Sequence, residues 1–118
     1  MKTAMIVDDA AVMRIRLRDI IEPKYKVVAE ASNGQEAIDL YARHQPDFVT
    51  LDITMQLKNG IEALEEIMNS HPDAQIVIVS AVGQKKMVFD AISKGAKDFI
   101  IKPFDADRVL ASIDRLFE

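Results

Sequence analysis

The sequence predicts an α/β protein: one domain with a doubly wound (βα)5 arrangement, in which helices cover both faces of a parallel five-stranded sheet. Five short apolar runs alternate with stretches of helical periodicity along the chain. The run at residues 76–79 is entirely β-branched, which is typical of a strand buried on both faces. Alternating strands and helices favour parallel strands joined by right-handed crossovers.

The first half of the chain supplies three strand–helix pairs. We expect strands over residues 4–7, 25–29 and 48–51, and helices over 10–22, from 32 to about 44, and from 60 to a stop at 71–72. Ser32 and Gln35 have the spacing of a capping box, which predicts that Ser32 begins the second helix.

The second half supplies two more pairs. We expect strands over 76–79 and 97–101, a helix over about 83–94, and a last helix beginning after residue 105. Gly95 follows the fourth helix, where a glycine often ends a helix in a left-handed conformation. Asp105 is the expected cap of the last helix.

Composition narrows the class of protein. A chain of 118 residues, 49% hydrophobic and 29% charged, suits one soluble domain spanning residues 1–118. The absence of cysteine excludes disulfides and thiolate chemistry and fits a reducing compartment, so we expect a cytoplasmic protein. The net charge of −4 disfavours nucleic-acid binding, and no apolar run predicts membrane insertion. We expect a monomer.

Polar residues follow four of the five predicted strands. They are Asp8 and Asp9 after the first strand, Asp52 after the third, Ser80 after the fourth and Lys102 after the fifth. Each alone could be a helix cap, a turn residue or a solvated loop residue. Ligands bind beyond the carboxyl ends of parallel strands, however, and the joint placement favours one functional site there.

The chemistry of these residues points to phosphoryl transfer. Three carboxylates brought together repel one another unless a cation neutralises them. An all-oxygen ligand set suits Mg²⁺, and a carboxylate nucleophile beside a metal, a lysine and a hydroxyl suits the transfer of a phosphoryl group. The sequence contains no GxxxxGK[ST] or GxGxxG loop, so we expect the phosphoryl donor to be another molecule.

The motifs and their spacing resemble the receiver domains of two-component response regulators. The matching blocks are residues 7–9 (VDD), 52–55 (DITM) with 59–60 (NG), 79–81 (VSA) and 97–104 (KDFIIKPF). Within this family, the blocks 80–84 (SAVGQ) and 95–100 (GAKDFI) are most similar to the stand-alone chemotaxis regulators. The likeness spans almost the whole chain and implies a flavodoxin-like fold.

The resemblance implies a role for each residue of the phosphorylation site. Asp52 would accept a phosphoryl group from a histidine kinase of the chemotaxis type (CheA-like). Asp9 and Asp52 would ligate Mg²⁺ directly, with the backbone carbonyl of Thr54 as a third ligand. Asp8 would act mostly through a bound water, and Lys102 would pair with the acyl phosphate.

The resemblance also implies a switch. Ser80 would donate to a phosphoryl oxygen, and Phe99 matches an aromatic residue that moves inward with that hydroxyl, although Phe99 could simply be a core aromatic. Pro103 matches a position at which the family commonly has a cis peptide, with an ordinary trans proline as the alternative. The last two helices and the last strand would form the output surface.

Partners and departures follow from the same comparison. The implied partners are the kinase, a downstream protein such as the flagellar motor switch, and a phosphatase. Gln56 stands where the family usually has proline, and Phe99 lacks the hydroxyl of a common tyrosine. Val82 offers no polar group to orient water, so we expect slow-to-moderate self-dephosphorylation.

Two other functions use similar residues. A Mg²⁺-dependent phosphatase of the haloacid dehalogenase type also has an aspartate nucleophile, but its motif is D-x-D, and here Asp8 and Asp9 are adjacent. A phosphorelay intermediate, or a receiver separated from a transcription factor, would retain the chemistry and change only the partner.

Overall fold

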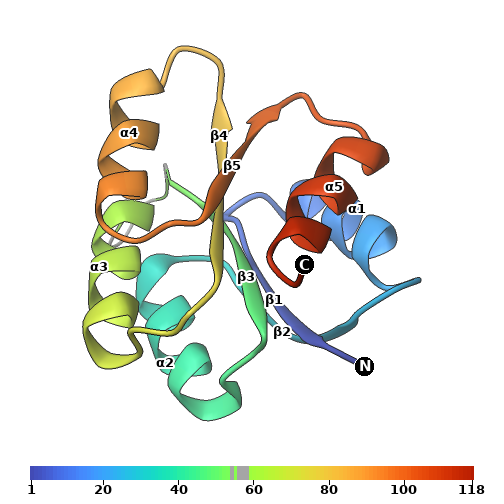
Figure 1. Cartoon of the computed structure of the whole chain (residues 1–118), viewed down its shortest axis with the longest axis horizontal. Coiled ribbons are helices and arrows are strands. Elements are labelled where there is room, and N and C mark those ends of the chain that lie inside the picture. The colour runs from blue at the N-terminus through green and yellow to red at the C-terminus, as the bar shows by residue number, and fades with distance from the viewer. Residues whose placement is uncertain (54, 56–58) are drawn as a thin grey trace.

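The computed structural model describes residues 1–53, 55 and 59–118, in which five strands alternate with five helices (Figure 1). The strands are β1 (Thr3–Val7), β2 (Lys26–Ala31), β3 (Phe48–Asp52), β4 (Ile76–Ala81) and β5 (Asp98–Lys102). The helices are α1 (Ala11–Ile21), α2 (Gly34–His44), α3 (Gly60–Ser70), α4 (Lys85–Ser93) and α5 (Ala106–Arg115). The predicted alternation is confirmed, with element ends displaced by one or two residues.

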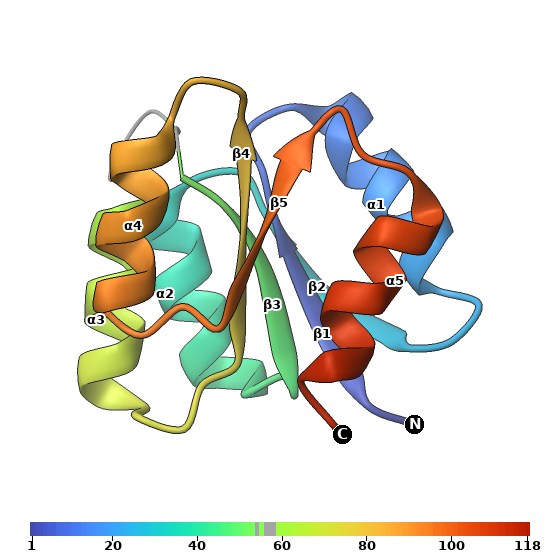
Figure 2. The ribbon, with the colours of Figure 1, turned by 45° about the horizontal axis from the view of Figure 1, so that its top comes forward.

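The five strands form one parallel sheet in the order β2-β1-β3-β4-β5 (Figure 2). The chain passes from β1 to β2 on one side and then returns to place β3 on the other side of β1. The strand order therefore reverses between β1 and β3, and this reversal marks the usual ligand site of an open α/β sheet. The predicted doubly wound α/β fold is confirmed.

Alternating side chains of the strands supply two hydrophobic cores, one on each face of the sheet. On one face α1 and α5 pack through buried residues that include Leu17, Ile21, Val109 and Ile113. On the other face α2, α3 and α4 contribute Tyr41, Leu64, Ile67 and Val88, among others. Because all five strands are parallel, their carboxyl ends lie together at one edge of the sheet.

The helix ends correct one prediction and confirm two. Ser32 is not the cap of α2, because Asn33 is the N-cap and its side chain accepts a hydrogen bond from the backbone N–H of Glu36. The hydroxyl and the backbone N–H of Ser32 both donate to the carboxylate of Glu36 instead. Asp105 caps α5 as predicted, and Gly95 follows α4 with a φ of 118°.

None of the helices within the described residues is both long and apolar enough to cross a membrane.

Candidate functional site

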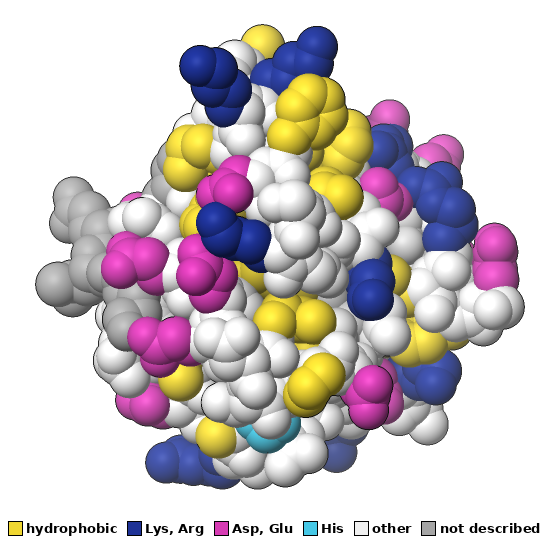
Figure 3. Space-filling model, turned by 60° about the vertical axis from the view of Figure 1, so that its left-hand side comes forward, with side chains coloured by type: hydrophobic (Ala, Val, Ile, Leu, Met, Phe, Trp, Pro, Cys, Tyr) yellow, Lys and Arg dark blue, Asp and Glu magenta, His cyan; other side chains and the backbone are white. Residues whose placement is uncertain are grey.

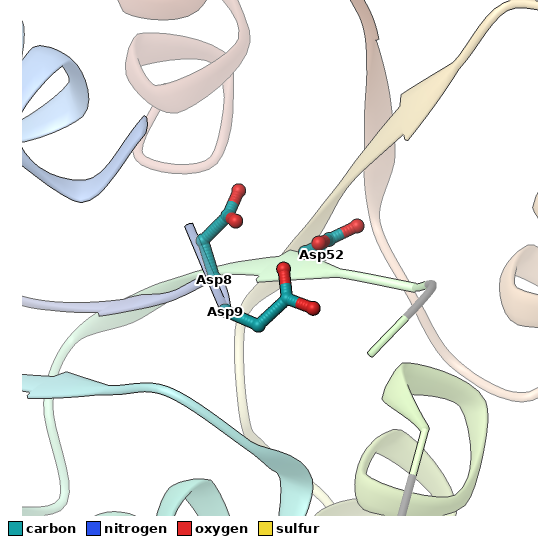
Figure 4. Close-up of side chains that lie close together, drawn as sticks. All are labelled: Asp8, Asp9 and Asp52. Carbon is teal, nitrogen blue, oxygen red and sulfur yellow. The ribbon is translucent and has the colours of Figure 1, made fainter. Parts of the chain in front are cut away.

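Three carboxylates meet where the strand order reverses (Figure 4). Asp8 and Asp9 directly follow β1, and Asp52 is the last residue of β3. One carboxylate oxygen from each residue lies within 4.8 Å of the other two. Asp8 and Asp52 are 0% and 2% exposed, whereas Asp9 is open to solvent. Two parallel strands thus bring together acidic residues that are far apart in the sequence.

Lys102 places a positive charge beside these carboxylates. It is the last residue of β5, and its Nζ atom lies 3.3 Å from Oδ2 of Asp8 and 3.8 Å from Oδ2 of Asp52. Its positive charge offsets part of the repulsion among the carboxylates. The next peptide bond, between Lys102 and Pro103, is cis, which confirms that prediction.

Ser80 lies at the same edge of the sheet. Its neighbour Val79 pairs with Asp52 across the β3–β4 ladder, so Ser80 lies one residue beyond the level of Asp52. Ser80 is fully buried, and its hydroxyl has no hydrogen-bond partner among the described residues. A buried hydroxyl without a partner is uncommon in folded proteins and marks a site where another group could bind.

Asp8 is fixed on three sides besides Lys102. Its backbone N–H donates to the carbonyl oxygen of Ala31 in β2 at 3.0 Å, and its Oδ1 accepts from the N–H of Ala10 at 2.9 Å. The backbone carbonyl oxygen of Asp8 accepts a hydrogen bond from Nη1 of Arg14 at 2.6 Å. Sequence reasoning missed Arg14, since nothing local distinguishes it from the other arginines of α1.

Gly60 allows α3 to begin directly against the end of β3. A Cβ atom at this position would lie 2.2 Å from the carbonyl oxygen of Asp52 and 2.4 Å from Cα of Ile53. No real side chain tolerates such distances, so this approach requires glycine. Asn59 caps α3 in a reciprocal capping box with Glu62. The Asn59-Gly60 pair marked a turn in the sequence, but not this contact.

Phe99 lies apart from the carboxylates, in β5. Its half-buried ring lines an apolar groove of about 320 Å³ between β5 and the start of α4, together with Val82, Phe89 and Ile101. Val82 and Phe89 are 75% and 60% exposed, which is unusual for side chains of this type.

The donor atoms of the acidic cluster fit a magnesium ion. The three convergent ligands are carboxylate oxygens, which Mg²⁺ prefers, and the described residues place no imidazole or thiolate among them. The exposure of Asp9 leaves the cluster open on one side, as required if the ion is to retain waters and contact a phosphate. Thr54 and Gln56, which the sequence also singled out, lie outside the described residues.

The fold and the site define a doubly wound α/β protein with an acidic site at its switch point. Residues 4–114 match the family model of the response regulator receiver domain, and the chain therefore belongs to this family. Receiver domains act as phosphoacceptor signalling switches rather than as enzymes that turn over a substrate.

Chemotaxis proteins are prominent among its relatives. The chain is 51% identical to the chemotaxis protein CheY of Thermotoga maritima over 98% of this chain and 97% of that protein. It is 54% identical to CheY of Bacillus subtilis over 94% and 93% of the two chains. The structure superposes with a TM-score of 0.95 on a chain in the CheX–CheY–BeF3–Mg²⁺ complex from Borrelia burgdorferi, at 36% identity, covering 99% of this chain and 90% of that one.

Proposed function

We propose that residues 1–118 form one receiver domain, in which Asp52 accepts a phosphoryl group from a histidine kinase and thereby controls a protein partner in chemotaxis. The observation that carries this proposal is the convergence of Asp8, Asp9, Asp52 and Lys102 at the switch point of the sheet. We expect the protein to act in the cytoplasm as a monomer.

The transfer moves a phosphoryl group from a phosphohistidine to a carboxylate. An oxygen of Asp52 donates an electron pair to phosphorus and forms the new O–P bond. The N–P bond breaks, and its electron pair returns to the histidine ring of the kinase. The ammonium group of Lys102, 3.8 Å from the Asp52 carboxylate, is placed to pair with the acyl phosphate.

Asp8, Asp9 and Asp52 would hold the magnesium ion that this transfer requires, with the carbonyl of Thr54 as a ligand implied by the family resemblance. When bound, Mg²⁺ neutralises the negative charge of the phosphoryl oxygens. Burial of Asp8 and Asp52 strengthens the attraction between these carboxylates and a cation, since the surroundings screen charge less than water does.

Phosphorylation would act through Ser80 and Phe99. The hydroxyl of Ser80, which lacks a partner among the described residues, would donate to a phosphoryl oxygen and move with it. That movement would shift β5 and α4, and with them the groove that Phe99 lines. A shift between two packings of this kind requires no new fold.

The groove and the adjoining parts of α4, β5 and α5 would be the output surface. Figure 3 shows hydrophobic side chains gathered near the N-terminal end of α4, with Lys and Arg side chains beside them. The flagellar motor switch is the proposed target, and a phosphatase is a further proposed partner. A similar CheY protein forms a complex with another protein, CheX, which supports a protein partner in general. Val82, two residues after Ser80, is exposed but has no polar group that could orient an attacking water. We therefore propose slow-to-moderate self-dephosphorylation.

A phosphotransfer assay with Asp52→Asn tests the proposal. Radiolabelled histidine kinase should label the unchanged protein in the presence of Mg²⁺ and should not label the variant. Asp105→Asn is the matched control, because asparagine also caps helices and this position lies outside the acidic cluster. Labelling of Asp52→Asn at the level of the unchanged protein would overturn the assignment.

A second assay separates the receiver from a phosphatase of the haloacid dehalogenase type. The receiver should release no phosphate from a generic phosphomonoester over many equivalents of protein. Steady turnover that depends on Asp52 would favour the phosphatase.

A further inference from the structure

β2 provides no carboxylate to the acidic cluster, yet charged side chains connect it to the site. Glu30, near the end of β2, lies 3.3 Å from Nε of Arg14 through one carboxylate oxygen. Its other oxygen accepts from Nε of Arg18 at 2.7 Å. Arg14 continues the connection by donating from Nη1 to the backbone carbonyl of Asp8 at 2.6 Å. Glu30 therefore pairs with the same guanidinium group that donates to the backbone carbonyl of Asp8.

The carbonyl that Arg14 contacts belongs to the peptide unit between Asp8 and Asp9. That unit is planar, so fixing its carbonyl oxygen also fixes its N–H, which is that of Asp9, and the direction in which the chain continues. The carboxylate of Asp8 has its own partners in Ala10 and Lys102. The exposed carboxylate of Asp9 accepts no hydrogen bond among the described residues, so its position depends on the backbone.

We propose that Arg14 is a positioning residue of the magnesium site: it orients the Asp8–Asp9 peptide so that Asp9 converges with Asp8 and Asp52, and Glu30 holds Arg14 in place. The inference rests on the proposed function, because it presumes that the cluster binds Mg²⁺. Arg14 acts through the backbone of the ligands and does not itself contact the ion.

The charge and the hydrogen bond of Arg14 have opposite effects on Mg²⁺ binding. A cation near a cation site weakens binding, and Glu30 offsets this repulsion by its own negative charge. Removing Arg14 should therefore tighten Mg²⁺ binding if charge dominates and weaken it if positioning dominates. Arg18 separates the two effects, since it pairs with the same Glu30 and carries the same charge but makes no hydrogen bond to Asp8.

The test compares Arg14→Met with Arg18→Met by calorimetric titration with MgCl₂. We expect Arg14→Met to raise the Kd for Mg²⁺ about tenfold, the size typical for losing a group that orients a metal ligand. Arg18→Met should leave the Kd unchanged or lower it. Arg14→Lys, which keeps the charge and one donor toward the Asp8 carbonyl, should recover part of the loss.

Measurements without metal distinguish positioning from general support of the fold. Thermal unfolding of the two metal-free methionine variants should be similar, because both lose an ion pair with Glu30 and one further contact. The further contact is the hydrogen bond to the Asp8 carbonyl for Arg14 and the ion pair with Glu22 for Arg18. In ¹⁵N spectra of the metal-free protein, the amide signal of Asp9 should shift in Arg14→Met and remain in place in Arg18→Met.

Equal Kd values for the two methionine variants, or tighter binding by Arg14→Met, would overturn the role of Arg14 and leave the proposed function intact. Failure of the unchanged protein to bind Mg²⁺ would overturn the proposed function and this inference with it.

Discussion

Lys102 reaches toward Asp52 in the unphosphorylated protein, with its Nζ atom 3.8 Å from the Asp52 carboxylate. The same ammonium group lies closer to Asp8, at 3.3 Å. Lys102 therefore offsets part of the negative charge of two buried carboxylates. If Asp52 is the phosphoryl acceptor that we propose, a lysine shared in this way would need to move only a short distance to pair with its acyl phosphate.

Replacing Lys102 with methionine should destabilise the metal-free protein. Asp8 and Asp52 would lose the nearby cation while remaining buried. Removing one partner of a buried ion pair costs roughly 3–5 kcal/mol. Because the Lys102 side chain is 22% exposed, we expect a smaller loss in the free energy of unfolding, about 1–3 kcal/mol.

Urea unfolding with and without Mg²⁺ measures this effect. The ion should restore part of the lost stability in Lys102→Met, because it binds only the folded cluster. Lys86→Met, at an exposed position of α4, is the control and should change little. A loss that is the same with and without Mg²⁺ would contradict the explanation.

Gly60→Ala should be more damaging than Gly83→Ala. At Gly60 the new Cβ would meet the backbone of Asp52 and Ile53, and the start of α3 would have to move. We expect a loss of about 3 kcal/mol or more and weaker Mg²⁺ binding. Gly83 has open space around its Cβ position but a φ of 92°, so alanine there should cost about 1–2 kcal/mol of backbone strain. Equal losses in urea unfolding would exclude the steric argument.

Tyr25 should make stability fall at high pH. Burial, together with the hydrogen bond that its hydroxyl donates to Asp114, raises the pKa of Tyr25 to about 12. The folded protein therefore holds this proton more tightly than the unfolded chain, whose tyrosine pKa is about 10. The stabilisation is complete below pH 10 and is lost as the pH rises to about 12.

Unfolding of Tyr25→Phe over the same pH range isolates this contribution. The variant lacks the titrating group, so its stability should fall less steeply than that of the unchanged protein between pH 10 and 12. Parallel curves would show that Tyr25 does not contribute to the pH dependence.

Phe89→Ser should weaken binding of the output partner without weakening the fold. The Phe89 side chain is 60% exposed and lines the groove beside Phe99, so its removal costs little packing within the chain. A pull-down of a purified flagellar switch protein with beryllofluoride and Mg²⁺ should recover less partner than with the unchanged protein. Val12→Ser, a comparable exposed change on α1, should bind normally. Equal recovery by both variants would remove this groove from the interface.

The order of the strands and helices could be predicted because each element carries its own pattern. The continuous β-branched run 76–79 and the amphipathic stretches on either side identify their structures without reference to the rest of the chain. The convergence of Asp8 and Asp52 could also be predicted, since parallel strands end at one edge of a sheet.

The cap of α2 and the roles of Arg14 and Gly60 could not be predicted from the sequence. Ser32 and Asn33 are both good caps, and in the structure Asn33 accepts the N–H of Glu36 while Ser32 donates to the Glu36 carboxylate. The roles of Arg14 and Gly60 depend on contacts with other elements, at 2.6 Å to Asp8 and against the end of β3. Such contacts between distant parts of the chain cannot be predicted from the residues that surround Arg14 or Gly60 in the sequence.

The orphaned hydroxyl of Ser80 has a thermodynamic consequence. A buried polar group without a partner costs about 1–3 kcal/mol, and the described residues offer Ser80 none. The resting conformation is raised in free energy by this amount relative to any conformation that supplies an acceptor. Gaps of a few kcal/mol are the size that separates interconverting states of a switch. In the switch that we propose, an acceptor supplied to Ser80 would therefore contribute part of the free energy that favours the second conformation.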